Sequence, residues 1–195
     1  QLRHAGEPGR VRYRRRGRRP RRVVLLIDVS GSMAAYTDSL LRLAHCLTRA
    51  APRHTEVFTM GTRLTRITRA MRQRDPDAAL ASAGATVPDW SGGTRLGEVL
   101  KAFLDRWGQR GVARGAVVVV CSDGWERGDS ALLGTQVERL ARLAHRLVWV
   151  NPHRGKVGFE PTQAGMAACL PHVDDLVAGH SFATFVELTE VMADA

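Results

Sequence analysis

The sequence is poor in cysteine and lacks long apolar runs, and each absence excludes a class of protein. Its 195 residues contain three cysteines without a Cys-x-x-Cys spacing, which argues against a disulfide-dense scaffold and is typical of a reduced compartment. The longest apolar runs, residues 23–27 and 116–121, are far shorter than the ~20 residues that a membrane-spanning helix needs. The first run is also too short for the core of a signal peptide. We therefore expect a cytoplasmic protein with no transmembrane segment.

Several catalytic motifs are missing as well. The sequence has no Gly-x-x-x-x-Gly-Lys-Ser/Thr phosphate loop, no Gly-x-Gly-x-x-Gly dinucleotide motif and no Gly-x-Ser-x-Gly nucleophile elbow. Its seven histidines form no His-x-x-His or His-x-x-x-His pair, which would indicate a metal site on a helix. These absences argue against the common nucleotide-binding sites, serine hydrolases and histidine-based zinc enzymes.

Acidic residues are outnumbered by Lys and Arg, 19 to 29, but the excess is confined to one segment. Residues 1–22 contain ten arginines and one glutamate, so nine of the ten net positive charges lie there. A like-charge block interspersed with Gly and Pro cannot collapse on itself, so we expect a flexible arm or linker at 1–22 and one domain at 23–195. A linker or a contact with a protein partner is favoured over contact with anionic lipid or nucleic acid, and for nucleic acid Tyr13 is the arm's only aromatic side chain for base stacking.

The sequence does contain a regular alternation of buried strands and amphipathic helices. Unbroken apolar runs predict strands covered on both faces, and apolar spacings of three and four predict helices. The expected elements are strand 23–27, helix 37–51, strands 56–60 and 63–68 with a tight turn between them, helix 76–84, helix 96–107, strand 117–121, helix 133–144, strand 147–150, helix 162–169, strand 173–178 and helix 181–193. This order predicts an α/β fold, with a mainly parallel central sheet, one antiparallel edge strand and helices on both faces.

Polar residues follow two of the buried strands, at the edge of the sheet where α/β folds bind ligands. A further hydroxyl follows a Gly-Gly pair in a loop between them. These residues are Asp28, Ser30, Ser32, Thr94 and Asp123. Two carboxylates and three hydroxyls suit Mg²⁺ or Mn²⁺ in octahedral oxygen coordination at ~2.1 Å, whereas zinc and copper fit poorly without imidazole or thiolate ligands. A set of capped turns is the simpler alternative, which the recurrence in three loops disfavours.

Three of these five ligands are neutral, so a bound cation would remain electrophilic. An open coordination position would then favour an Asp or Glu side chain of another protein. The first hypothesis is therefore a non-catalytic, metal-dependent binding module. Trp90 and Trp125 flank the metal loops and would either anchor a partner or pack against neighbouring loops. The alternative is a Mg-dependent phosphoryl hydrolase, but Ser30 stands where haloacid-dehalogenase-type phosphatases have a second acid.

Four segments carry a resemblance to a known family. They are Asp28-Val-Ser-Gly-Ser-Met33, Phe58-Thr-Met-Gly-Thr-Arg63-Leu, Asp89-Trp-Ser-Gly-Gly-Thr-Arg95 and Ser122-Asp-Gly-Trp-Glu-Arg-Gly128. Together they resemble the von Willebrand factor A (VWA) domain with its metal-ion-dependent adhesion site (MIDAS), and within that superfamily the bacterial CoxE-like branch. The resemblance covers about residues 23–193.

The resemblance implies a Rossmann-like VWA fold and a role for each of the five oxygen-bearing residues. Ser30, Ser32 and Thr94 would contact the metal directly, and Asp28 and Asp123 would hold it directly or through waters. CoxE-like proteins are associated with MoxR-type AAA+ ATPases and with the maturation of metalloenzymes, including molybdenum-containing carbon monoxide dehydrogenase. The resemblance therefore implies such an ATPase as partner, and together with the first hypothesis we expect no enzymatic activity.

Overall fold

A computed structural model describes residues 21–87, 90, 92–154 and 164–195. Most of the arginine-rich arm and part of the segment before the helix predicted at 162–169 therefore lie outside the described residues. Of the arm, only Arg21 and Arg22 are described, and their guanidiniums donate hydrogen bonds to the carbonyl oxygens of Ala195 and Gly111.

The helices and strands follow one another in the predicted alternation. In chain order they are β1 (Val23–Asp28), η1 (Gly31–Met33), α1 (Ala34–Ala50), β2 (Thr55–Met60), β3 (Leu64–Arg66), α2 (Thr68–Met71), α3 (Pro76–Thr86), α4 (Leu96–Phe103), η2 (Leu104–Val112), β4 (Val117–Cys121), α5 (Ser130–Leu143), β5 (Arg146–Asn151), α6 (Ala164–Cys169), η3 (Leu170–His172), β6 (Asp175–Ala178) and α7 (Phe182–Ala193).

The strands form a six-stranded sheet in the order β3-β2-β1-β4-β5-β6. All neighbouring strands are parallel except β2 and β3, whose antiparallel hairpin places β3 at one edge. Successive side chains of a strand point to opposite faces, so an unbroken apolar run can serve two cores at once. In β1, Leu25 and Ile27 pack on one face, while Val24 and Leu26 pack on the other.

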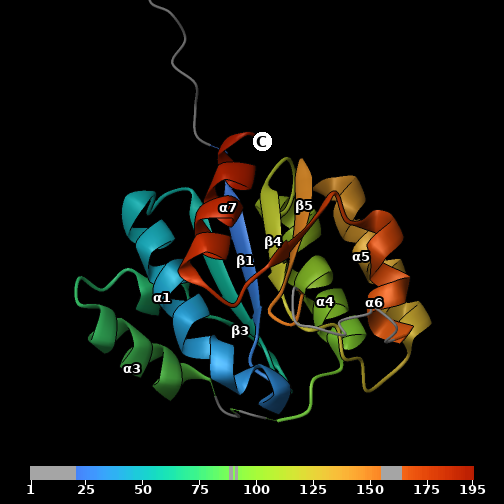
Figure 1. The fold of residues 1–195 in the computed structure, drawn as a ribbon, viewed down its shortest axis with the longest axis horizontal. Coiled ribbons are helices and arrows are strands. Elements are labelled where there is room, and N and C mark those ends of the chain that lie inside the picture. Colours follow the sequence, from blue (N-terminus) through green and yellow to red (C-terminus); the bar gives the residue numbers. More distant parts are fainter. Residues whose placement is uncertain (1–20, 88–89, 91, 155–163) are drawn as a thin grey trace, which may run out of the picture.

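Helices cover both faces of the sheet (Figure 1). The face with Leu25 packs against α1, α3 and α7, and the opposite face packs against α4, α5 and α6. The α/β class, the mainly parallel sheet and the antiparallel edge strand predicted from the sequence are thus confirmed. Among the described residues, none of the helices combines the length and the apolar character needed to cross a lipid bilayer.

Three details differ from the sequence prediction. The helix expected at 96–107 continues past α4 as the wider, π-helical η2, which contains Gly111 at φ 117°, a conformation that favours glycine. A one-turn helix, α2, follows β3 and was too short to give a periodic signal. The helix expected at 133–144 begins earlier, at Ser130, and Asp129 caps it, because its carboxylate accepts a hydrogen bond from the backbone N–H of Ala131 at 2.8 Å.

Candidate metal centre

The predicted site lies between β1 and β4, where the order of the strands in the sheet reverses. From β1 the chain leads through α1 to β2 on one side, and β4 pairs with β1 on the other side. The loops after β1 and β4 therefore diverge from neighbouring positions at the carboxyl edge, which is the usual ligand position in open α/β sheets. In the β1–β4 register Ile27 pairs with Cys121, so Asp28 and Ser122 follow side by side.

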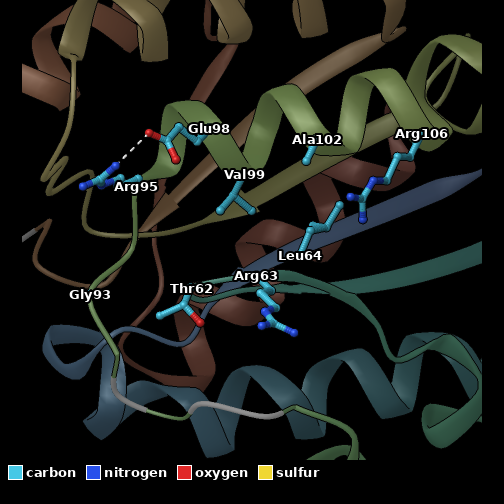
Figure 2. Close-up of a pocket in the computed structure, with 9 residues that line it drawn as sticks. All are labelled: Thr62, Arg63, Leu64, Gly93, Arg95, Glu98, Val99, Ala102 and Arg106. Atoms are coloured by element: carbon cyan, nitrogen blue, oxygen red, sulfur yellow. Dashed lines mark hydrogen bonds and ion pairs between the residues drawn. The ribbon is translucent and has the colours of Figure 1, made fainter.

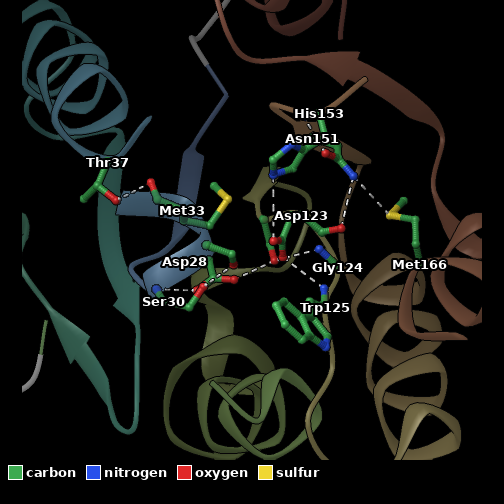
Figure 3. A network of polar contacts seen from close by, with 12 residues as sticks. Asp28, Ser30, Met33, Thr37, Asp123, Gly124, Trp125, Asn151, His153 and Met166 are labelled. Atoms are coloured by element: carbon green, nitrogen blue, oxygen red, sulfur yellow. Dashed lines mark hydrogen bonds and ion pairs between the residues drawn. The ribbon is translucent and has the colours of Figure 1, made fainter. Parts of the chain in front are cut away.

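Asp28 is the last residue of β1 and is only 1% exposed. Its carboxylate accepts hydrogen bonds from the Ser30 backbone N–H at 2.9 Å, the Ser122 hydroxyl at 2.7 Å and the Thr94 hydroxyl at 3.3 Å. Figure 3 shows part of this network. The three loops predicted to form the site thus meet on one carboxylate.

Burial is the largest effect on the Asp28 carboxyl and raises its pKa above the ordinary value of 3.8. The hydrogen bonds from Ser122 and Ser30 lower the pKa in part, and the nearby Asp123 carboxylate raises it further. A buried carboxylate with another carboxylate nearby is electrostatically costly unless a positive charge lies close to it. A bound cation would supply that charge.

The three predicted hydroxyl ligands line one small cavity. Ser30 directly precedes the single turn η1 and Ser32 lies within it, and their Oγ atoms lie 3.2 Å apart. Thr94 lines the same cavity of about 60 Å³, together with Trp125 and Arg127. The donor set fits a hard divalent cation, because it offers hydroxyl and carboxylate oxygens and no soft ligand. In the part of the chain that the structure describes, no group of three or more His, Cys, Asp and Glu side chains could hold a metal.

Asp123 is held in place by contacts that the sequence did not predict. Its side chain is buried, and its Oδ1 accepts a hydrogen bond from the backbone N–H of Trp125 at 3.0 Å. The buried Asn151 at the end of β5 donates to the Asp123 carbonyl oxygen at 3.1 Å, and Nε2 of His153 lies 4.0 Å from Asp123 Oδ2. Figure 3 shows these residues around the loop that follows β4. No sequence pattern marks these contacts, because Asn151 comes from a strand that carries no motif.

Glu126 is a second positioning residue in this loop. One carboxylate oxygen accepts from the backbone N–H of Gly97 at 2.8 Å, and the other accepts from that of Gly128 at 2.6 Å. Gly97 belongs to the first turn of α4, so Glu126 ties the loop that carries Asp123 to the helix that follows Thr94. An acid at a helix N-terminus is also favoured by the helix dipole.

The two tryptophans differ in environment. Trp125 is 54% exposed and lines the metal cavity, and the Arg127 guanidinium lies 5.8 Å from its ring centroid. Trp90 is half-buried against the core, and its ring N–H donates to the Gly84 carbonyl oxygen at 3.1 Å. Trp125 is therefore presented to solvent beside the cavity, whereas Trp90 packs against α3.

Known structures share this fold at low sequence identity. A von Willebrand factor type A protein from Catenulispora acidiphila is 17% identical with a TM-score of 0.57, over 89% of this chain and 42% of that one. Proximal thread matrix protein 1 from the mussel byssus, in a structure described as having a zinc-occupied MIDAS motif, is 17% identical with a TM-score of 0.51, over 88% and 43%. The pilus adhesin SpaC from Lactobacillus rhamnosus GG is 13% identical with a TM-score of 0.56, over 90% and 30%.

This chain therefore spans less than half the length of these structural neighbours. No curated protein sequence matches it. Residues 1–185 match the family described as "VWA domain containing CoxE-like protein", a range that also takes in the arginine-rich residues 1–22. With this match over most of its length, and with the fold described above, the chain belongs to the CoxE-like family of VWA domain proteins.

Proposed function

We propose that this protein is a non-catalytic, metal-dependent module for protein–protein interaction. One observation carries the proposal: the buried Asp28 carboxylate gathers donors from three separate loops, beside a cavity that the hydroxyl-bearing Ser30, Ser32 and Thr94 line. VWA domains in general serve as interaction modules, which agrees with this arrangement.

Each side chain has a distinct part in the proposed site. Ser30, Ser32 and Thr94 hold the cation directly, while Asp28 and Asp123 hold it directly or through waters. Mg²⁺ or Mn²⁺ suits these oxygens best, and zinc belongs among the cations to be tested, because a structural neighbour is described with zinc in its MIDAS. When bound, the cation supplies a positive charge and a coordination position for an Asp or Glu of the partner.

Membership in the CoxE-like family supports a more specific proposal for the partner. We propose a cytoplasmic MoxR-type AAA+ ATPase, with which this protein would act in the maturation or assembly of a metalloenzyme. The exposed Trp125 beside the metal cavity is suited to anchor such a partner, since Trp is frequent among interface hot spots.

Metal binding is tested first, by calorimetry and by thermal unfolding with Mg²⁺, Mn²⁺ or Zn²⁺. Thr94→Ala should abolish most of the metal-dependent rise in Tm while leaving the fold intact, because it removes one ligand at the edge of the sheet. Thr135→Ala is a matched control, since the exposed Thr135 hydroxyl only donates to the Ala131 carbonyl oxygen within α5. An equal metal response in wild type and Thr94→Ala would contradict the proposed ligand set.

Partner binding is tested by affinity purification with and without EDTA, asking whether an AAA+ ATPase co-purifies. Binding should be lost in EDTA and in Asp28→Ala. A partner that stays bound under both conditions would exclude a metal bridge. Sustained Mg-dependent hydrolysis of p-nitrophenyl phosphate that is lost in Asp28→Asn would instead establish a phosphoryl hydrolase.

A further inference from the structure

A groove of about 710 Å³ runs beside the metal cavity, between the turn after β2 and the helix formed by α4 and η2. Its charged lining comes from Arg63 on the turn and from Arg95, Glu98 and Arg106 on the helix. Figure 2 shows Arg95 and Arg106 at opposite ends of the helical stretch and Leu64 pointing toward the helix from the hairpin, whereas the exposed Arg63 side chain starts from the same hairpin and points away from the helix.

The groove adjoins the candidate metal centre. Gly93, next to Thr94, lines both the groove and the metal cavity. The turn that carries Arg63 lies at the same edge of the sheet as the metal centre, because Met60 at the end of β2 pairs with Asp28. A ligand that reaches the metal cavity can therefore extend into the groove.

The groove carries excess positive charge that its own residues do not neutralise. Arg95 pairs with Glu98 at 3.1 Å, but neither Arg63 nor Arg106 has a carboxylate within ion-pair distance among the described residues. By contrast Arg66, nearby on β3, is paired with Glu56. Residues 23–195 together carry a net charge of only +1, so the local excess of positive charge in the groove is balanced by acidic residues elsewhere in this range.

Arg127 extends the positive surface into the metal cavity. It packs so closely on Gly93 that a Cβ at that position would lie 2.5 Å from its Nη1 atom, which means that Gly93 leaves room for the guanidinium. The Arg127 guanidinium lies over the Trp125 ring. Among the described residues, no carboxylate forms an ion pair with Arg127. Within the described part of the chain, Arg127, Arg63 and Arg106 thus have no carboxylate partner, and they lie along one path that starts at the metal centre.

We propose that this path binds an acidic segment of a partner protein, whose first carboxylate occupies the metal centre and whose following carboxylates pair with Arg127, Arg63 and Arg106. The proposal rests on the proposed function, because it extends the same site. Guanidiniums match carboxylates in geometry as well as in charge. From Arg95 to Arg106 the helical stretch rises ~16 Å, which about five residues of an extended peptide can follow.

The apolar floor of the groove favours a peptide over a nucleic acid. Leu64, Val99 and Ala102 lie between the arginines and can contact the aliphatic parts of side chains. Among the described residues no aromatic side chain lines the groove itself, and Trp125 in the adjoining metal cavity is the single ring on the path, whereas proteins that bind single-stranded nucleic acids stack successive bases on aromatic rings.

The test measures fluorescence anisotropy of a fluorescein-labelled hexaglutamate peptide with the full chain in magnesium buffer at low salt. Arg63→Glu/Arg106→Glu should raise the Kd about tenfold and reduce its salt dependence, because two attractive charges become repulsive. The control variant Arg49→Glu/Arg53→Glu makes the same change in net charge. Both residues are exposed and lie just before β2, at the opposite end of the strands from the metal centre, so the Kd should stay within about twofold. Circular dichroism checks that all variants are folded.

The outcomes separate the groove from the metal centre. If EDTA abolishes binding and the Arg63/Arg106 variant binds as wild type does, the groove proposal is wrong and the metal proposal stands. If EDTA has no effect but the variant binds weakly, the metal bridge fails and the groove remains an acidic-peptide site. No binding of hexaglutamate to wild type overturns the groove proposal. Hexathymidylate that binds as tightly as hexaglutamate, and is weakened equally in the variant, would assign the groove to phosphates instead.

Discussion

At the scale of single residues, Ser122 connects the two loops that carry the carboxylates. Its buried hydroxyl donates to Asp28 Oδ2 at 2.7 Å and accepts from the backbone N–H of Gly124 at 3.1 Å. In the sequence Ser122 appears only as the neighbour of Asp123. Its role depends on the pairing of β1 with β4, which no local pattern reveals.

Ser122→Ala should lower the free energy of unfolding by about 1–3 kcal/mol in EDTA, because it leaves a buried carboxylate oxygen and a buried N–H without this partner. Urea unfolding followed by circular dichroism measures the change. Thr135→Ala removes an exposed hydroxyl and should change stability by less than about 0.5 kcal/mol. Equal stability of Ser122→Ala and wild type would show that water or a neighbouring group replaces the hydroxyl.

At the scale of elements, α6 packs closely on the loop that carries Asp123. Gly124 has φ 77°, and its backbone carbonyl lies so near Gly165 of α6 that a Cβ on Gly165 would collide with it. The same Cβ would lie 3.0 Å from the Cβ of Glu126, which ties this loop to α4. The helix therefore supports the backbone of the metal centre.

Gly165→Ala should destabilise the protein by about 1–3 kcal/mol, because the collision is with backbone and cannot be relieved by a rotamer change. It should also weaken Mg²⁺ binding, since the loop of Asp123 must shift. Gly84→Ala in α3 is a matched control: nothing lies within 4 Å of its added Cβ, and alanine is favoured over glycine in a helix by up to about 1 kcal/mol. Thermal unfolding and calorimetry with Mg²⁺ check both variants. A stable Gly165→Ala that binds Mg²⁺ normally would mean that α6 does not support the site.

Strands could be predicted well from the sequence where every side chain along them is buried. Val117 to Cys121 and Val23 to Ile27 are apolar at every position because both faces of the sheet are covered, and this pattern has few other interpretations. The single-turn α2 and the widening of α4 into η2 could not be predicted, because they depend on how neighbouring elements pack. The five ligand candidates were visible as a spaced motif, whereas their supports at Asn151 and Glu126 act through backbone groups that sequence spacing does not display.

Across the fold as a whole, the three cysteines differ in burial. Cys46 on α1 is exposed, whereas Cys121 in β4 and Cys169 in α6 are buried. Native protein at pH 8 should therefore react with one equivalent of a thiol reagent, at Cys46, and with three equivalents after unfolding in urea. Cys46→Ala should abolish the fast reaction. Rapid labelling of Cys169 in the native state would indicate that α6 opens locally.

Alkaline pH tests the packing of α6 by a separate route. Burial raises the pKa of the Cys169 thiol from 9.0 to about 12, with a smaller contribution from the negative charge of Glu126. Because the folded state disfavours the thiolate, this group leaves stability unchanged below pH 9 and lowers it as the pH rises from 9 toward 12. The expected loss is at most about 1.4 kcal/mol per pH unit in this window. Urea unfolding of wild type and Cys169→Ala at pH 8, 9 and 10 measures it. The variant should lose less stability above pH 9, and an identical pH dependence in both proteins would show that Cys169 is not held in an apolar environment.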